Sequence, residues 1–295
     1  MKTTQLLILT CVLSLNTVFA QENNINDGTQ TVEKSYLELP RIQVIPIKDT
    51  KNDRQYELYV KLPEGYSENG DIKYPVLYFT DALKHIEILS GSAEHVVENT
   101  ILVGISWQKD LKGKLGALGA HASRFRDYSI MKSSNPEHQA KYQRGQASNH
   151  LDFIRNDVIK YVENNYQTDS DNRSYFGYSM GAKFGAYILF VQPDTFKNYI
   201  LGSPGALLDG SYIYEHEPIT ALNQKELNAN VFVSIGALEK ESMLGHAKGL
   251  VSILKSKNYT DVSSKLVVIE SANHGGAFPM SAVRGMYWLS DLTKE

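Results

Sequence analysis

Cysteine is almost absent from this chain of 295 residues, where Cys11 is the only one. It lies in the opening segment MKTTQLLILTCVLSLNTVFA, in which Lys2 precedes an apolar run from Leu6 to Leu15. This pattern predicts a secretory signal peptide over residues 1–20, cut after Ala20, and therefore a periplasmic or secreted protein. The mature chain would contain no thiol, which excludes disulfides, thiol catalysis and cysteine-based metal sites.

Long apolar runs are lacking after residue 20. The longest stretches, such as PVLYF and VFVSIGA, have the length of strands, so no membrane span is expected. The formal net charge of −3 leaves nothing basic enough to bind nucleic acid. No H-E-x-x-H motif occurs, which argues against a metallohydrolase.

Linker-like composition, internal repeats and low-complexity tracts are absent as well. Residues 21–35, QENNINDGTQTVEKS, are polar, and we expect them to be disordered. The sequence predicts a single domain over residues 36–295.

Hydrophobic patterning indicates an α/β fold. Apolar and polar residues alternate over residues 41–47 and 55–61, which predicts an antiparallel pair at a sheet edge. Later segments are nearly continuous apolar runs, typical of strands that are covered on both faces; they are residues 74–80, 100–107, 174–179, 198–204, 231–236 and 265–271. Helical periodicity lies between them, so we expect a mostly parallel sheet with helices on both faces.

Residues 109–146 show little periodicity and contain several glycines. A long loop in a compact domain is usually functional, so we expect this segment to border the active site. Together with residues 204–218 it is predicted to shape the substrate pocket.

The central motif is Gly177-Tyr178-Ser179-Met180-Gly181, a G-x-S-x-G pattern between an apolar strand and a helix-like run. In that setting the pattern forms a sharp strand-to-helix turn that exposes the serine hydroxyl. Glycine at both ends allows the strand and the helix to approach closely. We interpret Ser179 as a nucleophile; without chemistry, the motif would be an ordinary Gly-Ser turn.

A serine hydroxyl needs a base to take its proton. Of eight histidines, only His274 follows the last predicted strand, where the base lies in this architecture, and we read the other seven as surface or ordinary polar residues. An acid should orient that base. Glu239 and Glu241 both follow the preceding strand, and we favour Glu239, although both would also suit a helix start.

The tetrahedral intermediate needs backbone donors. One is the N–H of Met180, the residue after the nucleophile, and the other comes from a loop after an earlier strand. Asp81-Ala82-Leu83 forms that loop.

These residues resemble the putative esterase family of α/β-hydrolases, which includes siderophore esterases, feruloyl esterases, S-formylglutathione hydrolases and mycolyltransferases. The similarity covers residues 40–292 and includes YPVLYFTDA, RFRDYS, the segment around GYSMG, and NHGGAFPMSAVRGMYWL. It implies Ser179 as nucleophile, His274 as base and Glu239 as acid, with the N–H groups of Met180 and Leu83 as oxyanion donors.

Two departures from the family pattern stand out. Ala82 replaces the usual glycine after Asp81, so we expect this loop to be less free to present its amide. LGSPGALLDG lacks the paired tryptophans of siderophore-type members, so a catecholate siderophore is less expected. Arg124 and Arg126 either contact an acidic substrate group or form a structural ion pair with Asp127.

The leading hypothesis is a serine esterase that acts on a small-molecule or glycan-linked ester and requires no metal or organic cofactor. Acyl transfer to a sugar or lipid hydroxyl is a second hypothesis on the same fold. A non-catalytic binding protein that keeps the turn as a scaffold is a third. The sequence does not indicate an oligomeric state.

Overall fold

The computed structural model describes residue 39, residues 41–205, 227–256 and 259, and residues 261–292. The predicted signal peptide, the polar segment 21–35 and most of the predicted pocket segment 204–218 lie outside the described residues. Eight strands form one sheet in the order β1-β2-β4-β3-β5-β6-β7-β8. Their bounds are β1 Ile42–Asp49, β2 Arg54–Lys61, β3 Tyr74–Phe79, β4 Ile101–Ile105, β5 Thr168–Tyr178, β6 Asn198–Gly202, β7 Ala229–Gly236 and β8 Val262–Ile269.

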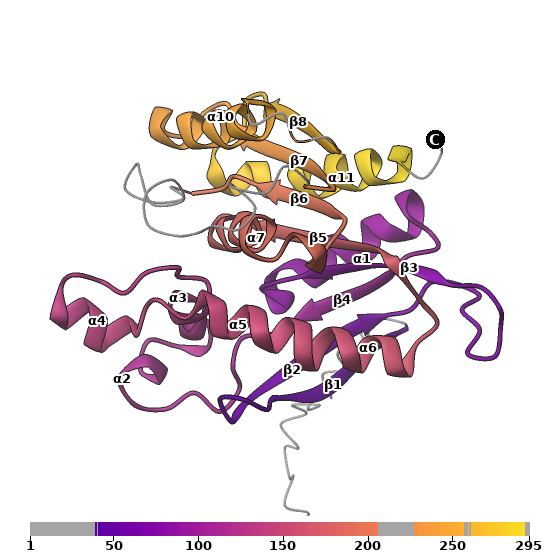
Figure 1. The fold of residues 1–295 in the computed structure, drawn as a ribbon, viewed down its shortest axis with the longest axis horizontal. Coiled ribbons are helices and arrows are strands. Elements are labelled where there is room, and N and C mark those ends of the chain that lie inside the picture. Colours follow the sequence, from indigo (N-terminus) through magenta and orange to yellow (C-terminus); the bar gives the residue numbers. More distant parts are fainter. Residues whose placement is uncertain (1–38, 40, 206–226, 257–258, 260, 293–295) are drawn as a thin grey trace, which may run out of the picture. The chain divides into compact units, whose positions relative to one another are not determined.

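The sheet has the predicted mixture of strand directions. Among the described strands, β1 pairs only with β2, and both the β1–β2 and the β2–β4 pairs are antiparallel. The remaining strands, β4, β3, β5, β6, β7 and β8 in sheet order, are all parallel. The prediction of an antiparallel edge beside a parallel sheet is therefore confirmed. The parallel strands carry apolar residues on both faces because helices cover both (Figure 1).

The helices on the two faces of the sheet pack against it and form two apolar cores. In β3, Val76 and Tyr78 enter the core shared with α7 and α10, whereas Leu77 and Phe79 enter the core shared with α1 and α11. The helix bounds are α1 Ala82–Val96, α5 Ala147–Phe153, α6 Lys160–Asn165, α7 Met180–Val191, α10 Glu241–Ser256 and α11 His274–Leu292, with a π-helical turn at Ile154–Ile159 and a short 3-10 helix at Pro193–Thr195.

The segment 109–146 differs from the expected structureless loop. It contains α2 Gly113–Gly116, a 3-10 turn Ala120–Ala122, α3 Ser123–Asp127 and α4 Pro136–Tyr142. α4 buries none of its side chains and is instead capped by Asn135, whose side chain accepts from the N–H groups of Glu137 and His138. A helix that buries nothing has no apolar periodicity, which explains why the sequence pattern did not reveal it.

Within the described residues, no helix is both long enough and apolar enough to cross a membrane.

The reading of seven histidines as surface or ordinary polar residues was wrong for His85 and His150, which are buried. His85 donates from Nδ1 to the carbonyl oxygen of Thr80 at 2.9 Å and stacks on Phe278. Burial lowers the pKa of His85 to about 4. Burial also lowers the pKa of His150, which lies among aromatic rings.

These depressed values predict acid sensitivity. Because the folded-state pKa of His85 lies below the unfolded value of about 6.5, its contribution to stability is complete above that pH and is lost as the pH falls toward 4. We expect the free energy of unfolding to fall by up to roughly 3 kcal/mol across this window from His85 alone. Urea unfolding at pH 7 and pH 4 measures this fall, and we expect a smaller fall in the free energy of unfolding for His85→Gln than for the wild type. His95→Gln, at an exposed position, should show the same fall as the wild type.

Candidate active site

Ser179 occupies the sharp turn between β5 and α7. Its φ of 55° lies in the left-handed region, and its N–H donates to the carbonyl oxygen of Gly202 at 2.8 Å. A Cβ at Gly177 would lie 2.4 Å from the carbonyl oxygen of Gly181, and a Cβ at Gly181 would lie 2.5 Å from Thr80 Oγ1. Both positions therefore require glycine, and Ser179 is left partly exposed at the carboxyl edge of the sheet.

His274 and Glu239 meet at that same edge, after β8 and β7 respectively. His274 Nδ1 lies 2.7 Å from Glu239 Oε2. The close approach of the two loops depends on Gly236, where a Cβ would lie 2.3 Å from the carbonyl oxygen of Ala272. Glu241 instead begins α10 and is exposed, so of the two acids left open by the sequence only Glu239 contacts the histidine.

The pair is buried on one side and open on the other. The side chain of Glu239 is 2% exposed and that of His274 is 48% exposed. Glu239 Oε1 accepts from the Gly236 N–H at 3.1 Å and from Ser203 Oγ at 2.5 Å. Its other oxygen is thereby left to His274, whose ring can present Nε2 on the open side.

The histidine also lies beside the turn. Its ring centroid is 5.2 Å from that of Tyr178, the residue before Ser179. Among the described residues no hydrogen bond joins His274 to Ser179. Such contacts are often long before substrate binds and shorten in the complex.

Two helices begin close to the turn that carries Ser179. Met180 is the first residue of α7 and Leu83 is the second residue of α1. The first N–H groups of a helix have no partner within it, and within the described residues neither N–H meets another acceptor. A Cβ at Gly181 would lie 2.5 Å from Thr80 Oγ1 and 3.5 Å from Asp81 Oδ2, so the start of α7 lies close to the loop that leads into α1. This arrangement suits the binding of an oxyanion.

The alanine at position 82 does not impede this loop. The left-handed conformation falls on Asp81, with φ of 58°, and Ala82 begins the helix with its side chain fully buried. The expectation that the missing glycine restricts the loop was therefore wrong.

Asp81 is fully buried, and the side chains of Arg124, Trp107 and Tyr128 donate to its carboxylate. It accepts two hydrogen bonds of 2.9 Å from Arg124, one to each carboxylate oxygen, and one of 2.6 Å from Trp107 Nε1. Arg126 pairs with Asp127 at 2.8 Å. Both arginines are thus structural within this chain, and the partner of Arg124 is Asp81 instead of Asp127.

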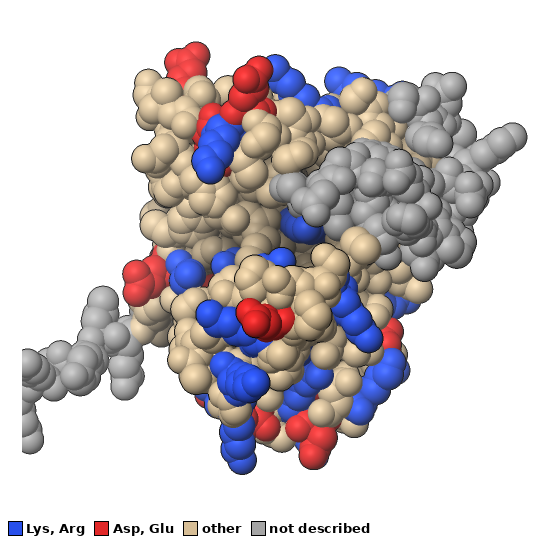
Figure 2. Space-filling view, turned by 90° about the vertical axis from the view of Figure 1, so that its left-hand side faces the viewer, with Lys and Arg blue, Asp and Glu red and all other residues tan. Residues whose placement is uncertain are grey.

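A pocket of about 250 Å³ opens beside Leu83. Its lining residues include Trp107, Lys109 and Leu111, together with Gly116, Gly119 and Ala120 from the segment 109–146. That segment also carries exposed basic side chains, namely Lys109, Lys112, Lys114, Lys132, Lys141 and Arg144. Over the lower part of the face drawn in Figure 2, where Figure 1 places α2 and α4, Lys and Arg are frequent, with a few Asp and Glu among them.

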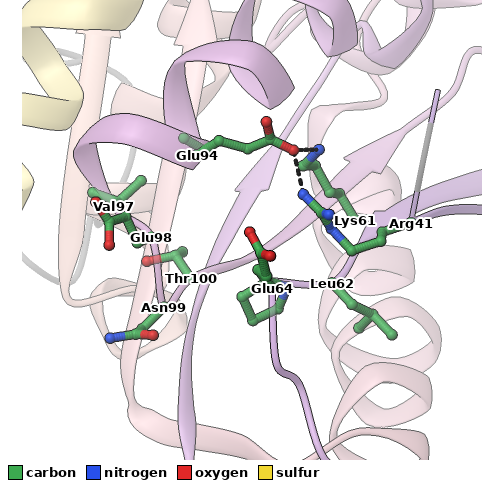
Figure 3. Close-up of a pocket in the computed structure, with 11 residues that line it drawn as sticks. Arg41, Lys61, Leu62, Glu64, Glu94, Val97, Glu98, Asn99 and Thr100 are labelled. Atoms are coloured by element: carbon green, nitrogen blue, oxygen red, sulfur yellow. Dashed lines mark hydrogen bonds and ion pairs between the residues drawn. The ribbon is translucent and has the colours of Figure 1, made fainter.

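Another pocket, of about 270 Å³, lies at the opposite end of the sheet, near Thr100 at the start of β4 (Figure 3). Glu94 accepts there from both Lys61 and Arg41. Glu94 is paired with these two cations, and the pocket is remote from Ser179. We therefore assign the pocket no part in the chemistry. No group of three or more potential metal ligands occurs within the part of the chain that the structure describes.

A mostly parallel sheet, a serine on a strained turn after β5 and a histidine after β8 define an α/β-hydrolase. The chain belongs to the family described as "Putative esterase", whose model matches residues 50–245, and it is an esterase.

Relatives of this chain include named siderophore esterases. The ferri-bacillibactin esterase BesA of Bacillus subtilis (strain 168) is 22% identical over 278 residues, which cover 88% of this chain and 93% of that protein. The structure of a BES protein from Bacillus cereus matches with a TM-score of 0.73 at 23% identity and covers 88% of this chain and 99% of that one. The siderophore hydrolase EstB from Aspergillus nidulans matches with a TM-score of 0.67 at 18% identity, over 87% and 96% of the two chains. These structural likenesses show a shared fold.

Removal of Arg124 tests the role of its ion pair. Arg124→Ala leaves the Asp81 carboxylate buried and unpaired, so we expect a loss of roughly 3–5 kcal/mol in the free energy of unfolding. Arg155→Ala is the control because the Arg155–Asp194 pair, at 2.8 Å, is far more exposed, with side chains 30% and 67% exposed, and its loss should cost about 1 kcal/mol. Urea denaturation at pH 7 measures both, and equal losses would contradict this account.

Proposed function

We propose that the protein is a serine carboxylesterase in which Ser179 forms an acyl-enzyme. The Ser179 hydroxyl attacks the ester carbonyl while His274 Nε2 takes its proton, and the resulting imidazolium returns that proton to the departing alkoxide. A water molecule, deprotonated by the same nitrogen, then attacks the acyl-enzyme. The proton passes back to Ser179 as the acid is released, so the enzyme is regenerated without an added cofactor.

The contact between Glu239 and His274 is the observation that carries this proposal. At 2.7 Å, the carboxylate fixes Nδ1 as the protonated nitrogen, so Nε2 is the nitrogen that accepts a proton. The Glu239 carboxylate also stabilises the positive charge that the His274 ring gains when it takes the proton. The N–H groups of Met180 and Leu83 would donate to the oxyanion, because both begin helices beside Ser179 and neither has an acceptor within the described chain.

We infer that the substrate is an anionic ester of the iron-siderophore type. The name of the Bacillus subtilis relative supports this inference, as do the exposed basic residues of the segment 109–146 beside the pocket. The missing paired tryptophans of LGSPGALLDG had made a catecholate siderophore less expected, and these two observations outweigh that departure. The side chain of His274 is half exposed, so water can reach the acyl-enzyme, as hydrolysis requires. We further propose that residues 1–20 direct export of the chain to the periplasm or beyond.

Loss of the nucleophile tests the reaction. We expect Ser179→Ala to lower kcat for p-nitrophenyl butyrate by roughly 10⁴-fold or more while the fold remains intact by circular dichroism. Ser203, a buried neighbour with a hydroxyl, is not expected to replace it because it faces Glu239. Hydrolysis at the wild-type rate in Ser179→Ala would contradict the proposed mechanism.

Charge reversal tests the substrate class. Lys114→Glu combined with Lys141→Glu should lower kcat/KM for a ferric tricatecholate lactone by about tenfold at low salt, with a smaller effect at high salt because the interaction is screened. The neutral p-nitrophenyl ester is the control and should be hydrolysed at the wild-type rate. An equal loss for both substrates, or no loss for either, would count against an anionic substrate.

A further inference from the structure

A chain of oxygen contacts joins the candidate acid to the backbone of the candidate base. Ser203 Oγ lies 2.5 Å from Glu239 Oε1 and 3.0 Å from the Tyr178 hydroxyl. The Tyr178 hydroxyl donates in turn to the carbonyl oxygen of His274. The mechanism above uses neither Ser203 nor Tyr178, and the sequence motif identifies neither of them as functional.

Counting protons fixes the direction of these contacts. A carboxylate only accepts, so the single hydroxyl hydrogen of Ser203 is directed to Glu239. Burial raises the pKa of Tyr178 to about 12, so its hydroxyl remains protonated and supplies the hydrogen for the His274 carbonyl. The Ser203 hydroxyl therefore donates to the acid, Glu239, and the Tyr178 hydroxyl donates to the backbone of the base, His274. The two hydroxyl oxygens lie 3.0 Å apart, so these two hydrogen bonds are adjacent.

Among the described residues, neutral donors bind only one oxygen of the Glu239 carboxylate. The Gly236 N–H and Ser203 Oγ both donate to Oε1, whereas His274 contacts Oε2. Without Ser203, the carboxylate would keep a single neutral donor and could rotate about its terminal torsion. The hydroxyl thus sets the angle at which Oε2 faces the histidine.

The backbone of Ser203 adopts an uncommon conformation where its hydroxyl meets Glu239. Ser203 is fully buried and has a φ of 45°, which is uncommon for a residue other than glycine. Its N–H donates to the carbonyl oxygen of Ser234 at 2.7 Å, which anchors it at the end of β6. Glycine would relieve the strain but would remove the hydroxyl. A strained polar residue beside a candidate site is a reason to look for function.

We propose that Ser203 and Tyr178 are positioning residues that hold the Glu239 carboxylate and the His274 backbone in register for proton transfer. This inference rests on the proposed esterase mechanism. Neither residue would touch the substrate, so their substitution should lower kcat with little effect on KM.

Ser203→Gly is the direct test because glycine accepts a positive φ and the variant should fold. We expect kcat for p-nitrophenyl butyrate to fall by roughly 10- to 100-fold, as for the loss of a hydrogen bond to a charged group, with KM within about twofold of the wild-type value. Tyr178→Phe keeps the ring against His274 and should lower kcat in the same way. Ser234→Ala removes another buried hydroxyl, whose partner Ser281 still donates to the Ala277 carbonyl, and should leave kcat unchanged.

A double-mutant cycle separates positioning from a merely structural effect. If Ser203 acts through Glu239, then Ser203→Gly should change kcat by less than about threefold in a Glu239→Gln background. An equal loss in both backgrounds, or a kcat of Ser203→Gly equal to that of the wild type, would overturn the inference and leave the esterase proposal standing. A wild-type protein that hydrolyses no ester would overturn both.

Discussion

The close approach of α7 to the ends of β3 and β5 is the constraint on which the candidate site depends. It requires glycine at positions 177 and 181, because a Cβ at either would fall within 2.5 Å of Gly181 O or Thr80 Oγ1. That approach holds Ser179 at a positive φ and sets the N-terminus of α7 against that of α1. The serine hydroxyl and two N–H groups that meet no acceptor within the described residues thereby share one edge of the sheet.

Two buried carboxylates flank this edge, and their surroundings give them different roles. Asp81 is neutralised by the two hydrogen bonds from Arg124, so its charge is used to hold the loop that presents Leu83. Glu239 has no cation of its own among the described residues and receives only neutral donors apart from His274. Its charge is therefore available to stabilise a protonated imidazole, which is what general-base catalysis requires.

The sequence predicted the sheet because buried parallel strands are continuous apolar runs, and it placed His274 because the last strand was recognisable. It could not decide between Glu239 and Glu241, since both follow β7 and only the approach of the 236 and 272 loops distinguishes them. The pairing of Asp81 with Arg124 joins residues far apart in the chain and has no local pattern. Ser203 gave no signal, because a buried serine after a strand looks like any other.

The central claim is that Ser179 is an activated nucleophile whose reactivity depends on His274. Intact-mass spectrometry after treatment with a fluorophosphonate, followed by peptide mapping, tests it most directly on the wild type and on His274→Ala. We expect a single adduct on Ser179 in the wild type and its loss or marked slowing in the variant. A folded wild-type protein that remains unlabelled, or labelling of Ser179 at the same rate without His274, would contradict it.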